Sequence, residues 1–373
     1  MIDQRITLVG DHIENPANAR MMMDAAALFG GRCAFRDGGE LAAKWLASFD
    51  DPGLPRIGRA EMAEQFSPII ALDNLKGAAD IYGYRLSPDP APAVMVGNER
   101  KGLTQEMREL ADQAVEIPMV SRRLNCLNVA AASAAALYYL ARGGGSRIRA
   151  SGRPERRRPE IMLIGGTDHF ELGSSIRSAG AFGWDRLLLD DRSGVWFGAA
   201  RAIQLEGRAA ARRSRNPIHV IPARLTRSTL FRQAYIVSAR RGAPLQTADL
   251  ARGPEQVIVI PDESAVDIQR EDWGWLAPEI RVVCLDLPVQ PNPESGIFAV
   301  DPGDRPGSPA GPPVYHYRFG ATIALAEIAR QVGRPARHIS SRPHRAAPEY
   351  ELELKLDRMD GAEKLFLEDL LDY

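Results

Sequence analysis

Cysteine is scarce in this sequence of 373 residues, and the three cysteines, Cys33, Cys126 and Cys284, stand far apart. An odd number at such spacing fits neither a disulfide framework nor a paired-cysteine zinc site. Long apolar runs are missing as well, because no stretch approaches the roughly 18 residues that cross a bilayer. The first residues also lack the layout of a secretory signal peptide. We therefore expect a cytoplasmic protein with no membrane segment.

The sequence has no surplus of charge of either sign, since 47 Lys and Arg residues against 48 Asp and Glu residues leave a net charge of −1. This balance excludes a broadly basic nucleic-acid-binding protein but allows a local basic patch. The six histidines show no metal-ligand spacing, and the phosphate-binding P-loop motif is absent from the sequence. We expect no bound metal.

The length predicts two domains, and the local composition indicates where they divide. Residues 144–158 are rich in Arg and Gly and have no apolar periodicity, which is typical of a flexible linker. Contact with RNA phosphates is the alternative interpretation of these arginines. We expect one domain at 1–143, a second at 159–335 and a C-terminal tail at 336–373, which is mostly acidic from residue 349 onward.

Short apolar runs alternate with stretches of helical periodicity through both expected domains. In the first domain we expect strands at 6–10, 68–73, 93–97 and 114–119, and helices at 17–29 and 127–142. In the second we expect strands at 160–166, 185–190, 217–222, 234–239, 256–261 and 280–287, and helices at 171–183 and 317–333. Such alternation predicts an α/β fold with a parallel sheet covered by helices on both faces.

Three features recur in the same order in the two domains. The matching pairs are MDAAALFG (23–30) with RSAGAFG (177–183), VMVGNE (94–99) with VIVIPDE (257–263), and EIPM (116–119) with DLPV (286–289). Chance similarity between α/β repeats is the alternative, but recurrence in one order favours an internal duplication with a diverged second copy.

The segments NPANARMMMDAAALFG, VGNERKGL and EIPM, followed by CLNVAAASAAAL, stand in an order that resembles the SpoU/TrmH branch of the SPOUT methyltransferases. The resemblance covers residues 5–142 well and 159–333 more faintly. It implies a C-terminal trefoil knot in the first domain, S-adenosylmethionine as methyl donor and a ribose 2′-hydroxyl of tRNA or rRNA as acceptor. Members of this family work as homodimers, so a duplicated chain implies an intramolecular pseudo-dimer, with a homodimer as the alternative.

The resemblance also implies which residues hold the donor, although ordinary strand-to-helix turns are the alternative interpretation of these loops. Open α/β sheets bind ligands beyond the C-terminal ends of their strands. Transferred residue by residue, the donor contacts are Gly97, Asn98, Ile117, Met119, Leu127 and Asn128. The expected contacts to substrate RNA are Arg20, Arg122 and Arg123.

The family's catalytic positions are divided between the two domains. Asn18 matches the family's asparagine, but Asp24 stands where the family has an arginine. In the second domain Arg177 matches that arginine, while Glu171 stands at the asparagine position. A composite site would combine the two domains, because a guanidinium near a ribose hydroxyl favours the charge that develops on its oxygen. The expected catalytic set is Asn18, Glu99, Asn128 and Arg177.

Three alternatives stay open at this point. Asp24 would abolish methyl transfer in a decayed enzyme that acts as an RNA-binding or scaffold module. A small molecule would be the acceptor if no RNA-binding domain accompanies the fold. Asp24 beside Arg20 would act as a base for an acceptor other than ribose.

Overall fold

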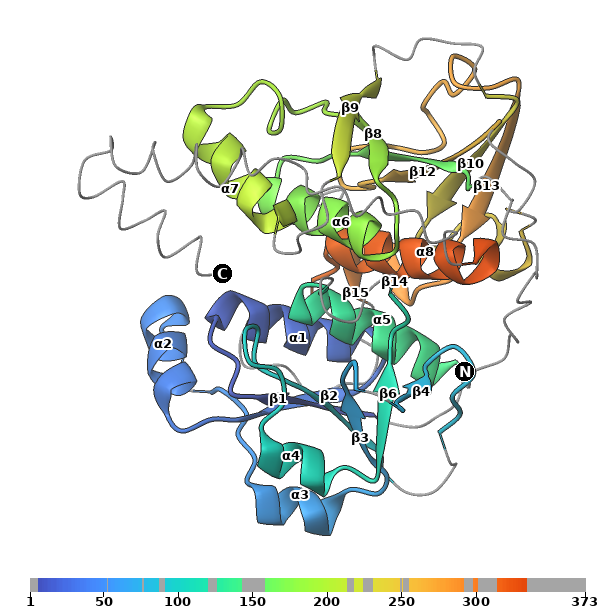
Figure 1. The fold of residues 1–373 in the computed structure, drawn as a ribbon. Coiled ribbons are helices and arrows are strands. Elements are labelled where there is room, and N and C mark those ends of the chain that lie inside the picture. Colours follow the sequence, from blue (N-terminus) through green and yellow to red (C-terminus); the bar gives the residue numbers. More distant parts are fainter. Residues whose placement is uncertain are drawn as a thin grey trace, which may run out of the picture.

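The computed structural model describes residues 6–51, 53–75, 77–86, 91–119, 126–142, 158–212, 218–223, 231–248, 250, 255–291, 298–300 and 314–333. These residues form two parallel sheets, each flanked by helices, with a layer of four helices between the sheets (Figure 1). The expected α/β architecture is therefore confirmed. The tail at 336–373 and nearly all of the linker at 144–158 lie outside the described residues.

The first sheet has the strand order β2-β1-β5-β3-β6-β4, and its strands are parallel. Strands β1 and β5 lie inside the sheet and are buried along their whole length, and β5 is a continuous apolar run. Leu8 of β1 pairs with Cys33 on one side and with Val94 on the other. The strands are β1 (Thr7–Asp11), β2 (Arg32–Arg36), β3 (Ile69–Leu72), β4 (Ala79–Asp80), β5 (Ala93–Val96) and β6 (Gln113–Glu116).

The helices of the first half are α1 (Pro16–Leu28), α2 (Glu40–Phe49), α3 (Arg59–Gln65), α4 (Gln105–Leu110) and α5 (Val129–Ala141). Helix α1 begins where the Asn15 side chain accepts a hydrogen bond from the Ala17 amide, and Pro16 occupies the first turn. Helix α5 consists largely of Ala, and ten of its side chains are buried. Its small residues allow α1 and α8 to pack closely against it.

The second half has strands β7 (Glu160–Ile164), β8 (Arg186–Asp190), β9 (His219–Pro222), β10 (Gln233–Ser238), β11 (Ala243–Pro244), β12 (Gln256–Pro261) and β13 (Glu279–Cys284). They form a parallel sheet in the order β11-β13-β10-β12-β7-β8-β9. A separate antiparallel pair joins β14 (Val289–Pro291) to β15 (Phe298–Val300). The helices are α6 (His169–Ala181), α7 (Arg201–Arg212), the short 3₁₀ helix η2 (Leu245–Thr247) and α8 (Tyr317–Val332).

The two sheets share one strand order. Strands β2-β1-β5-β3-β6-β4 of the first half correspond to β8-β7-β12-β10-β13-β11 of the second, which has β9 as an additional edge strand. The duplication of one domain stays a prediction, and this shared order supports it. The trefoil knot also stays a prediction, because residues 120–125, which precede α5, lie outside the described residues.

The four helices between the sheets are α1 and α5 from the first half and α6 and α8 from the second (Figure 1). Apolar side chains of α5 and α8 belong to one hydrophobic core that extends across both halves. Polar contacts cross the same layer: the Tyr139 hydroxyl donates to Glu327 at 3.1 Å, and the Arg142 guanidinium donates to the carbonyl of Asp286 at 2.7 Å. No helix in the described ranges is long and apolar enough to cross a membrane.

Candidate functional site

Three of the four expected catalytic side chains form a hydrogen-bonded chain beside the first sheet. Nδ2 of Asn18 donates to Oε1 of Glu99 at 2.9 Å, and Nδ2 of Asn128 donates to Oδ1 of Asn18 at 3.0 Å. Asn128 also caps α5, because its side-chain oxygen accepts from the main-chain amides of Ala130 and Ala131. The fold thus brings together residues that are 81 and 110 positions apart in the sequence.

Glu99 connects the loop after β5 to the start of α1. Besides the Asn18 amide, its carboxylate accepts the main-chain N–H groups of Glu14 at 3.0 Å and Asn15 at 3.3 Å. Three N–H donors around one carboxylate fix its orientation and compensate for its partial removal from water. Glu99 therefore fixes the relative positions of the α1 start and this loop.

The loop after β5 is closed by its own hydrogen bonds. Oδ1 of Asn98 accepts the main-chain amides of Arg100 and Lys101, while its Nδ2 donates to the carbonyl of His12 at 2.7 Å. A Cβ atom at Gly97 would lie 2.0 Å from the main chain of Gly102, so only glycine fits. The close approach at Gly97 is thus between two parts of the same loop.

The expected donor contacts Ile117, Met119 and Leu127 contribute apolar surface. Ile117 and Leu127 are buried, and Met119 packs against the same hydrophobic core. Leu127 directly precedes Asn128, so an apolar side chain and an amide lie next to each other at the start of α5. Arg122 and Arg123 lie outside the described residues.

Arg177 reaches this place from the second half of the chain. From α6 its Nε donates to the carbonyl of Cys126 at 2.7 Å, and its Nη2 donates to the carbonyl of Leu127 at 2.9 Å and to Sγ of Cys126 at 2.7 Å. The side chain is only 6% exposed, and this burial lowers the pKa of Arg177. Its Nη1 has no hydrogen bond to any residue in the described ranges. All four expected catalytic residues therefore gather around the start of α5.

Asp24, which stands where the resemblance implied an arginine, faces away from this group and toward the second half. Its carboxylate accepts the main-chain amide of Val314 at 3.2 Å and lies 3.0 Å from Nε2 of His316. Arg20 lies one turn away on α1, with its Nε 3.7 Å from Asp24. The charge of Arg20 is therefore partly balanced by Asp24 before any RNA phosphate approaches.

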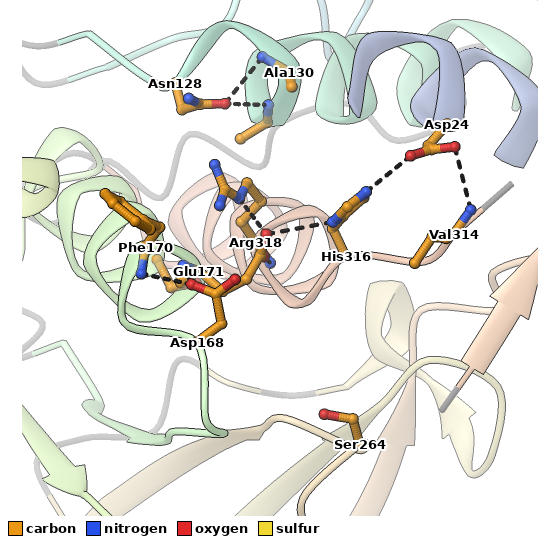
Figure 2. Close-up of polar contacts among 12 residues, drawn as sticks. Asp24, Asn128, Ala130, Asp168, Phe170, Glu171, Ser264, Val314, His316 and Arg318 are labelled. Carbon is orange, nitrogen blue, oxygen red and sulfur yellow. Dashed lines mark hydrogen bonds and ion pairs between the residues drawn. The ribbon is translucent and has the colours of Figure 1, made fainter. Parts of the chain in front are cut away.

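The corresponding place in the second half holds a cluster of charges, shown in Figure 2. Glu171 accepts hydrogen bonds from both the main-chain amide and Nε of Arg318, each at 2.7 Å, and lies 3.4 Å from Nδ1 of His316. Burial alone would raise the pKa of Glu171, but Arg318 and His316 lower it to about 2. Burial alone would lower the pKa of His316, but its hydrogen bonds to Asp24 and Glu171 raise it to about 9.

The loop after β12 also differs from the loop after β5. Glu263, at the position that corresponds to Glu99, accepts from the Ser238 hydroxyl at 3.2 Å and from the Ala239 amide, both at the end of β10. Burial raises the pKa of Glu263 to about 7. Within the described ranges, the chain of amide and carboxylate contacts made by Asn18, Glu99 and Asn128 is not repeated in the second half.

The sequence indicated Glu171 and Arg318 only as departures from a family pattern, and it gave His316 no role. His316 is the residue immediately before α8. Cys126 lies in the comparable segment of the first half, two positions before Asn128, the cap of α5. Only the packing of α1 against the start of α8 shows that this histidine meets Asp24.

Residues 58–138 match the model of the SpoU rRNA Methylase family. The resemblance seen in the sequence is thus confirmed for this segment. The SpoU-type segment runs from the cap of α3 into α5, and so it contains Glu99, the loop after β5 and Asn128. Asn18 and the whole second half lie outside it.

Solved SpoU-type structures are similar over part of the chain. AviRb, a SpoU methyltransferase from Streptomyces viridochromogenes, is 23% identical over 41% of this chain and 63% of its own, with a TM-score of 0.29. The AviRb complex with AdoMet is 22% identical over 37% of this chain and 57% of its own, with a TM-score of 0.29. The TrmH/SpoU tRNA modifying enzyme of A. aeolicus is 20% identical over 38% and 75%, again with a TM-score of 0.29.

This chain therefore spans less than two thirds of the length of both AviRb structures. None of the curated proteins compared with this chain matches it.

Proposed function

We propose that this protein transfers a methyl group from S-adenosylmethionine to RNA, and that a ribose 2′-hydroxyl of tRNA or rRNA accepts it. The observation that carries the proposal is the approach of Arg177 to the loop that leads into Asn128, within a segment of SpoU type. Asn18, Glu99 and Asn128 supply the neighbouring polar groups.

The residues at the start of α5 fit the chemistry of the donor. An adenosine moiety needs apolar surface for its ring and hydrogen-bonding groups at its edges, and binding sites of this kind are mostly apolar with a few placed polar groups. Met119, which is only partly buried, offers apolar side-chain surface, Ile117 and Leu127 are buried beside it, and Asn98 and Asn128 supply the neighbouring amides. Gly97 and its loop would contact the donor through the main chain. When bound, the donor supplies an activated methyl group.

The chemistry at the acceptor needs a group that favours loss of a hydroxyl proton. Methyl transfer forms a carbon–oxygen bond, breaks the bond from the methyl carbon to the donor sulfur, and releases the hydroxyl proton to water. A buried guanidinium stabilises the negative charge that develops on the oxygen. Arg177 has Nη1 free of hydrogen bonds to the described residues, and we assign it to this task.

Glu99 acts by position. It holds the start of α1, and so it orients Asn18 toward Asn128 and the donor loop. Arg20 at the same helix, together with Arg122 and Arg123, would contact the phosphates of the RNA. Because one chain supplies both Asn128 and Arg177, a monomeric pseudo-dimer suffices for activity, and a homodimer is not required.

Two measurements test this function. Calorimetric titration with S-adenosylmethionine should show binding, and incubation with methyl-labelled donor and total RNA from cells lacking the protein should label RNA. Ribose methylation blocks alkaline cleavage at the neighbouring phosphodiester, so the label should remain in alkali-resistant dinucleotides. Arg177→Lys keeps the charge but loses the fork of contacts to Cys126 and Leu127, and we expect it to lower turnover at least tenfold.

Other outcomes would contradict the proposal in distinct ways. Absence of donor binding at millimolar concentration would favour a decayed enzyme that serves as a binding module. Donor binding without any labelling of RNA would favour a small-molecule acceptor. Full activity of Arg177→Lys and Arg177→Ala would exclude the composite site.

A further inference from the structure

Asp24 and Arg177 make reciprocal contacts between the two halves. Each residue stands five positions before a Phe-Gly pair at the end of its helix, α1 or α6. Arg177 of α6 contacts Cys126 and Leu127 just before α5. Asp24 of α1 contacts Val314 and His316 just before α8. Asp24 and Arg177 therefore occupy matching positions on α1 and α6, and each contacts the segment that precedes a helix of the other half.

The contact at Asp24 is part of a buried cluster of four charges. Asp24 is 3% exposed, Glu171 8% and Arg318 6%, and His316 lies between the two carboxylates (Figure 2). The two carboxylates face Arg318 and, when it is protonated, His316. Arg20 of α1 adds a further cation, with its Nε 3.7 Å from Asp24. Removing one partner from such a cluster leaves an uncompensated buried charge, which makes the arrangement specific.

This cluster is connected to Arg177 through one rigid element. Glu171 and Arg177 lie six residues apart on the 13-residue helix α6. His316 contacts Glu171 at one end of that helix, and Arg177 contacts Leu127 from the other part. Asn128 then contacts Asn18, and Asn18 lies on α1 with Asp24. The polar contacts form a closed circuit through α1, the start of α8, α6 and the start of α5.

We propose that Asp24 and His316 are a pair of positioning residues: their contact fixes α6 against α1 and so holds Arg177 at the loop of Cys126 and Leu127. The catalytic meaning of this placement rests on the proposed function, but the placement itself can be tested without donor or RNA. Asp24 of α1 then contributes to placing Arg177 of α6.

Cys126 provides a local reporter of where Arg177 lies. Its sulfur accepts a hydrogen bond from Arg177 at 2.7 Å, and the side chain is exposed. Thiol reagents attack this sulfur directly, so the rate of labelling depends on the groups that contact it. The other two cysteines react poorly at neutral pH, because burial raises the pKa of both Cys33 and Cys284. The rate of thiol labelling in the native protein therefore reports on Cys126.

The experiment compares labelling of the full chain in the wild type and in the variants Asp24→Ala and His316→Gln. We expect each variant to slow the labelling of Cys126 about three- to tenfold as the guanidinium moves away. Arg177→Met sets the rate without a guanidinium. The double variant Asp24→Ala with His316→Gln should label no more slowly than either single variant, because the two changes remove the same contact. Exchange of the two groups, Asp24→His with His316→Asp, should restore part of the rate.

Tyr139→Phe is the matched control. It removes a different hydrogen bond between the halves, from α5 to Glu327 of α8, and touches neither α6 nor His316. A general loosening of the two halves would slow or speed labelling in this variant too, whereas we expect the wild-type rate.

Wild-type labelling of Cys126 in both Asp24→Ala and His316→Gln, with circular dichroism showing native folding, would overturn the proposal. If Asp24→His with His316→Asp labels Cys126 as slowly as the single variants do, this would also contradict a direct contact between positions 24 and 316. Slower labelling together with unchanged methyl transfer to RNA would support the positioning pair and contradict only the proposed catalytic role of Arg177. The two failures are thus distinguishable.

Discussion

His316 of the second half lies 3.0 Å from Asp24 of the first, although 292 positions separate them in the sequence. The carboxylate of Asp24 is surrounded by the amide of Val314 and the imidazole of His316. Val314 and His316 of the other half, together with Arg20 of α1, compensate for the removal of this acid from water. Asp24 is therefore part of the interface between the halves.

Stability should fall with rising pH because of His316. Its pKa is raised from 6.5 to about 9, so the stabilisation is complete below about pH 6.5 and is lost as the pH rises through about 9. The groups that face the ring are Asp24, Glu171 and Arg318. Urea unfolding at pH 6.5 and pH 9.5 should show a loss of up to about 3 kcal/mol in the wild type.

His316→Gln is the control for that measurement. The free energy of unfolding of this variant should change much less between pH 6.5 and pH 9.5. Subtracting its pH profile from that of the wild type removes the contribution of other groups, including Glu263 with its pKa of about 7. Equal pH profiles in the two proteins would show that His316 does not carry the effect.

Asn128→Ala should weaken both folding and donor binding. The variant removes the cap of α5, at about 1 kcal/mol of unfolding free energy, and it breaks the contact with Asn18. Asp168 caps α6 in the same manner through Phe170 and Glu171, so Asp168→Ala is the matched control. Calorimetry should show at least tenfold weaker donor binding for Asn128→Ala alone, and a similar loss in Asp168→Ala would make the effect one of stability.

Gly97→Ala should destabilise the loop after β5 even without a ligand. The added Cβ would meet the main chain of Gly102 and Leu103 at 2.0 Å, which forces the loop open at about 1–3 kcal/mol. Gly58→Ala is the comparison, because nothing lies within 4 Å of a Cβ there. Thermal unfolding of both variants checks the prediction, and equal melting temperatures would refute it.

Glu99→Gln removes the negative charge of this side chain and leaves its shape almost unchanged. The amide keeps one oxygen, either for Asn15 and Asn18 or for Glu14, but its NH₂ group faces donors where the other carboxylate oxygen accepted them. We expect a destabilised start of α1 and at least tenfold weaker donor binding. Hydrogen exchange at the amides of Glu14 and Asn15 measures the first effect directly, and unchanged protection there would contradict it.

The sequence predicted much of the fold because its apolar runs and helix caps are local signals. The expected strand at 256–261 and the observed β12 coincide, and the expected helix at 127–142 becomes α5 at Val129–Ala141 once Asn128 is recognised as its cap. Helices α2, α3 and α4 were missed, since each is short and only Leu41, Trp45, Met62 and Met107 of their residues are buried.

The site was predictable to the extent that it resembled a family pattern. Asn18, Glu99 and Asn128 stand at positions that a motif can indicate, and the structure brings them into hydrogen-bonding distance. The partners of Asp24 were not predictable, because they come from the start of α8 and depend on how the two halves pack. Contacts between elements so distant in sequence leave no local pattern in either one.

The layer formed by α1, α5, α6 and α8 joins two halves that belong to one chain. Two identical subunits placed in this way must carry the same residue at both symmetry-related positions, so a change that suits one site is imposed on the other. A single polypeptide is free of that constraint. Position 24 can hold a negatively charged side chain while position 177 holds a positively charged one. Each half can therefore change without a matching change in the other.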